Sequence, residues 1–272
     1  MSGTKTLLAG SVLAAVTVAG AAGCSGADGS SSSGARTDTA PRTAATGAPN
    51  AGLTGPQLRN AFASAVSAGT SVHVAGTVAQ SGSPFSLDLN LDKNGSSEGS
   101  VAQSGATVPI KVVGGVTYIQ LTPQFLKLEA ASDPSITPSV INAIQNKWVS
   151  SRSPVGQSLA SGLGSLTGYS SFLGTIESGG SSSASPAPSA SASGSAGPLV
   201  LSELTPAGTT TYQGKTVAVY KGKGGATAYF AASGPAYLER VTASGPGGGT
   251  LTFTWNKPVA VTAPPSSDIF TG

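Results

Sequence analysis

The clearest pattern along the chain is a strict alternation of apolar and polar residues at positions 85–92. Every second position there carries a large apolar residue: Phe85, Leu87, Leu89 and Leu91. A period of two predicts a β-strand with one buried face. Weaker alternation at 71–79 predicts a preceding strand, and the Asn-Gly turn at 94–95 predicts a hairpin to a glycine-rich strand at 99–103. An antiparallel meander is therefore expected, and it continues with two strands around a Gly-Gly turn: 106–113 and 116–121.

A helix is predicted ahead of this meander, at 54–69. Thr54 is a favoured N-cap residue, and Pro56 lies in the first turn, where its missing N–H costs nothing. Apolar residues then recur on one helical face until Gly69 ends the helix: Leu58, Phe62, Ala65 and Val66. One face of this helix is expected to be buried.

The pattern changes after residue 122. Short helices are predicted at 124–129 and 137–144, a strand at 147–149, and a loose, glycine-rich helical region at 155–176. Four more strands are expected toward the C-terminus: 212–221, 226–232, 236–244 and 249–256. Together these elements predict one α+β domain.

The first 23 residues are predicted to be a signal peptide with a lipobox. Lys5 precedes 16 apolar or small residues at 7–22, a run shorter than the ~20 residues of a membrane-spanning helix. The thiol of Cys24 can form a thioether with a diacylglyceryl group, and acyl chains would then hold the protein on the outer face of the cell membrane. Ala21 stands where bacterial lipoproteins usually have Leu. The alternative is an ordinary secretory cleavage that leaves Cys24 without a role.

Two tracts consist almost only of Ser, Gly, Ala, Thr and Pro. Residues 24–52 have no large apolar side chain, so they are predicted to be a disordered tether to a domain at 53–272. Residues 178–198 are predicted to be a disordered loop that interrupts this domain. The alternative is a boundary between two domains at 178–198, which would leave the remaining residues to fold as an isolated sheet.

Composition and charge exclude several function classes. Charged residues make up 9% of the chain, against roughly a quarter in an average domain, which suits an extracytoplasmic protein. The net charge is +3 and the basic residues are scattered, so nucleic acid is not expected as a partner. One Cys and one His, His73, exclude a disulfide framework and a Cys/His zinc cluster, and no hydrolase motif accompanies His73. No enzyme activity or cofactor is predicted.

A calcium site is also not predicted. Asp88, Asn90 and Asp92 offer oxygen ligands at alternate positions, but an EF-hand loop would need Glu where Gly99 stands. On a strand these three residues share the face opposite the leucines, so we interpret them as a solvated surface.

Several segments occur in an order that resembles a known family. After the lipobox and tether come SVHVAGTV, FSLDLNLDKNGSSEGSV, VGGVTYIQL, NKWV, YQGKTVAVY, ATAYF, AYLERV and LTFTWNKPVAVTAPP. This order is similar to that of the LppX/LprG-like lipoproteins of actinobacteria and covers roughly residues 54–272. The resemblance implies a LolA-like fold: a curved, unclosed antiparallel half-barrel with helices on its concave face and a hydrophobic cavity between them. The insertion at 178–198 and the glycine-rich helices depart from the family pattern.

The expected inner face of this sheet is unusually apolar and is the candidate ligand site. Its predicted ligand-binding residues are Val72, Val74, Val78, Phe85, Leu87, Leu89, Leu91, Val116, Tyr118, Trp148, Tyr229, Phe253 and Trp255. Glycine-rich helices alone fill such a face poorly, so a lipid, lipoglycan or other amphiphile is predicted to complete the packing. The sequence therefore predicts a membrane-anchored carrier or sensor without catalysis. Two alternatives stay open: the aromatic residues belong to an ordinary core, and the domain is a scaffold for cell-envelope assembly with a protein partner.

Overall fold

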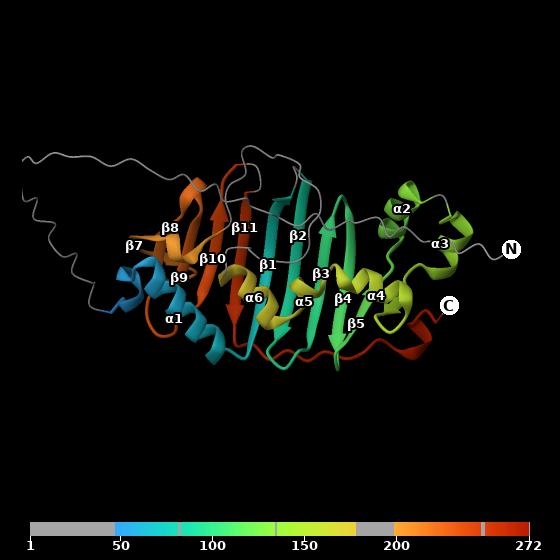
Figure 1. Ribbon diagram of the computed structural model, residues 1–272, viewed down its shortest axis with the longest axis horizontal. Coiled ribbons are helices and arrows are strands. Elements are labelled where there is room, and N and C mark those ends of the chain that lie inside the picture. The colour runs from blue at the N-terminus through green and yellow to red at the C-terminus, as the bar shows by residue number, and fades with distance from the viewer. Residues whose placement is uncertain (1–46, 81–82, 134, 178–198, 246–247, 272) are drawn as a thin grey trace, which may run out of the picture.

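The computed structural model describes residues 47–80, 83–133, 135–177, 199–245 and 248–271 (Figure 1). The predicted signal peptide, Cys24, most of the predicted tether and the tract at 178–198 lie outside these residues.

One antiparallel sheet of eleven strands organises the described chain. Its strands are β1 (Ser71–Gln80), β2 (Ser83–Asp92), β3 (Ser97–Gln103), β4 (Ala106–Val113), β5 (Val116–Gln120), β6 (Trp148–Ser150), β7 (Thr205–Tyr212), β8 (Lys215–Lys221), β9 (Thr227–Ala231), β10 (Leu238–Ala243) and β11 (Gly249–Trp255). The chain enters at the central strand β1 and adds β2 to β6 outward on one side. It then starts again at the far edge with β7 and returns through β8 to β11, which pairs with β1. Because β6 and β7 are at opposite edges, the sheet is unclosed.

Six α-helices accompany the sheet in the described part of the chain. They are α1 (Gly55–Ala68), α2 (Pro123–Ser132), α3 (Pro138–Ile144), α4 (Pro154–Ser161), α5 (Gly164–Thr167) and α6 (Tyr169–Glu177). Figure 1 shows α1, α6, α5 and α4 crossing one face of the sheet in that order, with α2 and α3 at its β6 end. No helix within the described ranges is long and apolar enough to cross a membrane.

Local sequence explains where several helices begin. At α1, the Thr54 backbone N–H donates to Gln57 Oε1 at 2.9 Å. The hydroxyls of Thr122, Thr137 and Ser153 accept backbone N–H groups in the first turns of α2, α3 and α4. Each of these caps is followed by a proline in the first turn, where the proline's fixed φ suits the helix.

Short 3₁₀ turns and a long C-terminal segment complete the chain. The 3₁₀ turns are η1 (Pro49–Gly52), η2 (Leu201–Glu203), η3 (Lys223–Gly225) and η4 (Ser266–Asp268). Residues 257–271 run past the ends of the strands from β1 to β6, shown in red in Figure 1. We call this segment the C-terminal strap. Lys111 Nζ donates to the Thr262 carbonyl at 3.3 Å, and the Phe270 N–H donates to the Trp148 carbonyl at 2.8 Å.

The buried apolar residues form two clusters. The main core lies between the sheet and α1 and α6, and it includes Leu58, Phe62, Leu89, Leu173 and Phe230. The smaller core lies at the β6 end. Its buried members are Leu121, Leu126 and Val149, and the strap contributes Phe270 to it.

Most predicted elements are confirmed, with two corrections. The sequence pattern missed β7, because this strand carries almost no apolar residue. The predicted strand 212–221 in fact contains the last residue of β7, a turn and β8, and the two strands form a hairpin. The boundary at residue 53 was also wrong. Residues 48–52 are packed on the domain, since the Asn50 side chain donates to the carbonyls of Ala231 and Gly234 at 2.9 and 3.0 Å. These two bonds replace water for a buried amide, so the packed domain begins near Ala48, which is also buried.

Candidate functional site

The helix-covered face of the sheet is the candidate ligand site. The main core contains nine of the predicted ligand-binding residues: Val72, Val74, Val78, Phe85, Leu87, Leu89, Leu91, Phe253 and Trp255. The pairing register explains this grouping, because Val74 lies between Leu89 on β2 and Phe253 on β11. Residues paired across an antiparallel sheet share a face, so the three strands present one continuous apolar surface.

Helix α1 closes the β11 side of this face with aromatic packing. The Phe62 ring meets the rings of Phe230 and Trp255 edge to face, with centroids 6.1 and 6.3 Å apart. The Trp255 indole N–H donates to the Leu238 carbonyl at 2.7 Å, and its other ring face stacks on Tyr237 at 4.7 Å. Because the polar atom of Trp255 is satisfied, this end of the face is a closed core.

Helix α6 is tied to α1 through Tyr169. The Tyr169 hydroxyl donates to the Val66 carbonyl at 2.8 Å. Burial raises the pKa of Tyr169 to about 12. Phe172 and Leu173 from the next turn also enter the main core. Gly69 allows this close approach, since a Cβ there would lie 2.4 Å from the Tyr169 hydroxyl oxygen.

Helices α4 and α5 bury fewer residues than α1 and α6. The only buried residue of α4 is Gly156, and the only buried residue of α5 is Thr167. The apolar side chains of Leu163 and Leu166 reach the main core but stay partly exposed. The segment 154–167 therefore covers the sheet with few buried residues, although Leu159 of α4 packs against the smaller core.

A seam of partly buried apolar residues follows the border between helices and sheet. The strands contribute Val78, Val108 and Leu251, and the helical side contributes Leu163, Leu166 and Ile176. Each packs against the main core and still reaches solvent. This seam is where an apolar ligand would first meet the covered face.

Four predicted site residues do not lie on the helix-covered face, so their assignment to it was wrong. In β5 the core-facing residue is Ile119, which pairs with Ile110, and alternation turns Val116 and Tyr118 to the opposite face. Trp148 also lies opposite, where Lys111 Nζ is 5.7 Å from its ring centroid.

Tyr229 lies on that opposite face as well. Its neighbours Ala228 and Phe230 point into the main core, so the intervening side chain points away from it. Its ring stacks on Tyr212 instead, with centroids 6.3 Å apart. These positions follow from the side-chain period of two, in which a one-residue error reverses the face.

Several core residues of this face were not among the predicted site residues. The sheet adds Val101, Ile110, Tyr220, Phe230 and Leu238, and the helices add Leu58, Phe62, Tyr169, Phe172 and Leu173. The helical spacing of the latter group was the available signal. The pattern around Phe230 was ambiguous, because a strand here could bury either Phe230 or its neighbour Tyr229.

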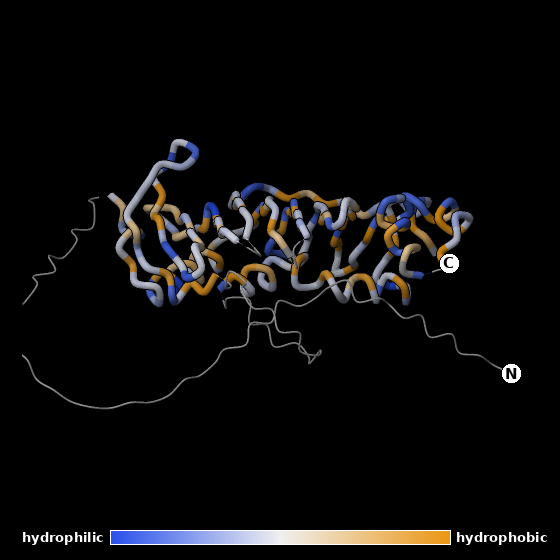
Figure 2. The backbone as a smooth tube through the Cα atoms, turned by 90° about the horizontal axis from the view of Figure 1, so that it is seen from above, coloured by the Kyte–Doolittle hydropathy of each residue, from blue (hydrophilic) through white to orange (hydrophobic). Residues whose placement is uncertain are grey.

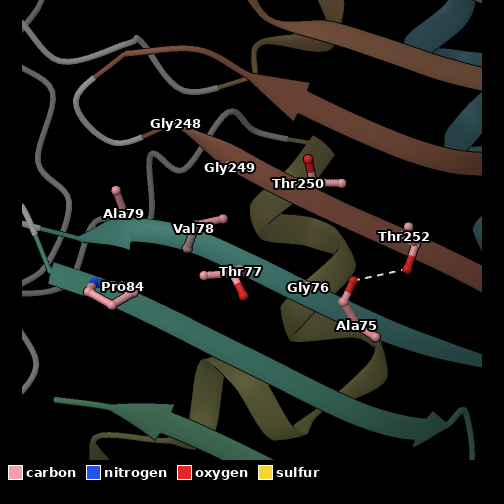
Figure 3. Close-up of a pocket in the computed structure, with 10 residues that line it drawn as sticks. All are labelled: Ala75, Gly76, Thr77, Val78, Ala79, Pro84, Gly248, Gly249, Thr250 and Thr252. Atoms are coloured by element: carbon pink, nitrogen blue, oxygen red, sulfur yellow. Dashed lines mark hydrogen bonds between the residues drawn. The ribbon is translucent and has the colours of Figure 1, made fainter. Parts of the chain in front are cut away.

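The helix-covered face is closed in this structure. Leu58, Phe62, Val72, Val74 and Leu91 have no exposed surface, and Phe85 is 9% exposed. An open depression of about 700 Å³ lies elsewhere, where β1, β2 and β11 meet (Figure 3). Its lining includes Ala75, Thr77, Thr250 and Thr252, which alternate with the core-facing residues of β1 and β11, and it also includes Val78 of the seam.

The described residues contain few groups that could carry out catalysis or bind a metal ion. His73 Nε2 lies 2.8 Å from Asp88 Oδ1 on the face away from the helices, and both side chains reach solvent. Within the described ranges, no three His, Cys, Asp or Glu side chains converge to hold a metal ion.

Comparison with solved structures finds several chains that are similar in structure. No family model matches the chain, and no curated protein is significantly similar to it. The solved structure of LprF from Mycobacterium bovis is similar, at 16% sequence identity and a TM-score of 0.42, over 77% of this chain and 96% of that one. A likeness at this TM-score assigns no ligand to the present chain.

Proposed function

We propose that this protein is a lipoprotein anchored outside the cytoplasm through Cys24, which binds a lipid or other amphiphile between its sheet and the helices α4 to α6. The proposal includes no catalysis. The observation that carries it is the unequal attachment of the helices. α1 is fixed by buried aromatic contacts, whereas α4 and α5 bury one small residue each over strands that are strongly apolar.

The ligand site is created by displacement of the weakly attached segment 154–167. The segment is bounded by Gly168, whose extended backbone separates α5 from α6. Moving it away would expose core side chains of β2, β3 and β4: Leu87, Leu89, Val101 and Ile110. Exposed apolar area costs roughly 25 cal/mol per Å², so an acyl chain in the same place would offset the cost of opening.

Affinity would come mainly from burial of methylene groups, each worth about 0.8 kcal/mol. Such contacts are not directional, so the site would accept the acyl chains of lipids with different head groups. The seam residues Val78, Val108 and Leu251 mark the route by which a chain would enter. Anchoring through Cys24 would keep this route close to the membrane from which a ligand comes.

A second candidate function is a scaffold for cell-envelope assembly. The closed state of the helix-covered face favours it, because a filled core needs no ligand. In this alternative the outer surfaces of the domain, and not its interior, would carry the interaction.

Native mass spectrometry of the full chain with Cys24→Ser distinguishes the two. This variant lacks the covalent acyl group, so any lipid mass reports non-covalent binding. We expect a stoichiometric adduct from gently purified protein that denaturation releases as a lipid. A bare protein mass, with no uptake from added membrane lipids, would overturn the proposal and leave the scaffold.

Two matched variants locate the binding. Val108→Gln places a polar group in the seam, whereas Val155→Gln changes a side chain that is 49% exposed on the outer side of α4. We expect Val108→Gln to lower the fraction of protein that carries lipid and Val155→Gln to leave it unchanged. Equal effects would place the lipid outside the seam.

A further inference from the structure

The face of the sheet away from the helices carries an arginine with an unusual environment. The Arg240 guanidinium carbon lies 5.6 Å from the ring centroid of Tyr212 and 5.9 Å from that of Tyr229. The two rings are themselves stacked. Figure 2 shows the hairpin that carries Tyr212 extending from the sheet on the side away from the helices, as the pale loop at the upper left.

Arg240 lacks an acceptor for its buried N–H group. Among the described residues, its Nε is buried and has no hydrogen-bond partner. The ion pairs of the same residues join Arg59 to Glu177, His73 to Asp88 and Lys223 to Glu203, and none includes Arg240. A buried donor without an acceptor is costly, and a guanidinium cannot avoid this cost by losing its charge.

The neighbouring charges leave this arginine available to an anion. Glu239 is adjacent in sequence, but it forms no ion pair with Arg240 within the described chain, and its closest charge interaction is with Lys215. Lys215 pairs in register with Tyr212, and the nearby Glu239 carboxylate offsets its positive charge. Both tyrosine rings lie on the same side of the guanidinium, since their centroids are only 6.3 Å apart, so its other side and its in-plane donors are left to bind a ligand.

The open depression begins one strand away from the backbone of Arg240. Arg240 pairs with Thr252 across β10 and β11, and Thr252 lines the depression together with Thr250 and Thr77. Figure 3 shows the Thr252 hydroxyl donating to the Ala75 carbonyl, at 3.0 Å. With its proton used in this way, the Thr252 oxygen can accept a hydrogen bond from a ligand hydroxyl.

Two glycines shape the floor of the depression. A Cβ on Gly76 would lie 2.0 Å from the Thr250 carbonyl oxygen, and one on Gly249 would lie 2.2 Å from the Thr77 carbonyl oxygen. Glycine is therefore required at both positions, and backbone forms part of the lining. The lining of the depression is mostly apolar, from Ala75, Val78, Ala79 and Pro84, and the threonines and backbone add polar groups to it.

We propose that Arg240, held on the Tyr212–Tyr229 pair, binds the phosphate or carboxylate of a hydroxyl-rich ligand whose remainder lies in the threonine-lined depression. Bidentate binding of an oxyanion satisfies the arginine donors, and the threonines suit hydroxyl groups. Arg240 and the threonines are on the face opposite the main core, whereas Val78, which also lines the depression, packs against that core. Anion binding by Arg240 does not depend on lipid binding.

The first test follows the Nε–Hε signals of arginine by ¹⁵N NMR while inorganic phosphate is added to the full chain with Cys24→Ser. The Arg240 Nε–Hε signal is assigned because it disappears in Arg240→Gln. Its chemical shift is expected to change as phosphate is added and to reach a plateau. Arg59, which is paired with Glu177 on the helical face, is the internal control and should shift less and without saturation. Equal, non-saturating shifts of both signals would overturn the proposal.

Three variants and two ligands sharpen the test. Arg240→Gln should weaken phosphate binding about tenfold or more, whereas Arg59→Gln should not change it. Thr252→Val should weaken binding of a sugar phosphate and leave inorganic phosphate unaffected. Tighter binding of glucose 1-phosphate than of glycerol 3-phosphate would identify a glycan as the source, and the reverse would identify a lipid headgroup. If neither binds more tightly than inorganic phosphate, the depression holds no part of the ligand and that half of the proposal fails.

Discussion

Two buried tyrosines join distant parts of the chain through single hydrogen bonds. The Tyr169 hydroxyl donates to the Val66 carbonyl, which ties α6 to the end of α1. The Tyr220 hydroxyl donates to the Asn50 carbonyl, which ties β8 to the first packed residues of the domain. Burial raises the pKa of both tyrosines, because the phenolate would lose its hydration.

Tyr169 makes stability sensitive to alkaline pH. Its pKa is raised to about 12 from an ordinary value of 10, so the folded protein keeps a proton that the unfolded chain loses. Stability from this group is complete below pH 10 and is lost as the pH rises from about 10 to about 12. We expect Tyr169→Phe to cost about 1 kcal/mol at neutral pH and to make the alkaline loss less steep. Urea unfolding at neutral pH and near pH 11 measures both effects.

The control for this prediction is Tyr118→Phe on the opposite face of the sheet. Tyr118 is only partly buried. Its substitution should therefore change neither the stability at neutral pH nor the steepness of the alkaline loss. Some alkaline loss will remain in Tyr169→Phe because Tyr220 is intact. A Tyr169→Phe protein that loses stability between the two pH values as steeply as the unchanged chain would contradict the assignment.

At the scale of elements, the glycines of the helical segment have opposite roles. Gly174 lies inside α6, and a Cβ there would meet no atom within 4 Å. Gly174→Ala should therefore stabilise α6 by about 0.5 to 1 kcal/mol, since alanine loses less backbone entropy on folding. Hydrogen exchange of the α6 amides should slow. On the proposed function, release of bound lipid should slow with it, and faster exchange would contradict the prediction.

Gly156 instead allows α4 to contact β6. A Cβ at Gly156 would lie 2.0 Å from the Ser150 carbonyl oxygen, so Gly156→Ala must move the helix away from the strand. We expect a loss of about 2 kcal/mol or more and faster hydrogen exchange in α4. Gly162→Ala is the matched control, because its nearest atom would be 3.7 Å away. Similar losses in both variants would show that the contact with β6 is unimportant.

Sequence patterns predicted these elements better than they predicted the faces of some strands. The alternation from Phe85 to Leu91 has one possible core face, because the intervening residues are polar, and this prediction of the buried face was correct. In β5 and β9 both alternate sets contain apolar residues. The sequence analysis assigned Tyr118 and Tyr229 to the inner face, whereas the pairing register buries Ile119 and Phe230. Register depends on neighbouring strands, so the segment alone does not determine it.

The sequence pattern predicted neither β7 itself nor a buried face for it. Its residues from Thr205 to Thr211 are exposed, so the strand buries no alternating set that a pattern could reveal. It forms through backbone pairing with β8 at the edge of the sheet. The Arg240 site was missed for a related reason, because Tyr212, Tyr229 and Arg240 come from three strands and are adjacent only after the sheet has formed.

At the scale of the whole molecule, the C-terminal strap connects the two cores. It leaves β11 beside the main core and reaches the small core, where Phe270 packs with Leu126 and Val149. Along the way Lys147 Nζ donates to the Ser267 carbonyl at 2.9 Å. The edge strand β6 pairs on its outer side with the strap through Trp148 and Ile269, which protects an otherwise open edge.

Removal of the strap should therefore loosen one end of the molecule and leave the other intact. In a chain that ends at Lys257, hydrogen exchange is expected to accelerate in β5, β6 and the helices α2 to α4. Exchange in β8 to β10 should not change, because these strands have their own core around Phe230. The milder Phe270→Ala should give the same pattern with a loss of about 2 kcal/mol, and Thr271→Ala, an exposed position, should have no effect. Uniform acceleration across the sheet would show that the two cores unfold together, and the strap would then stabilise the whole sheet and not only the β6 end.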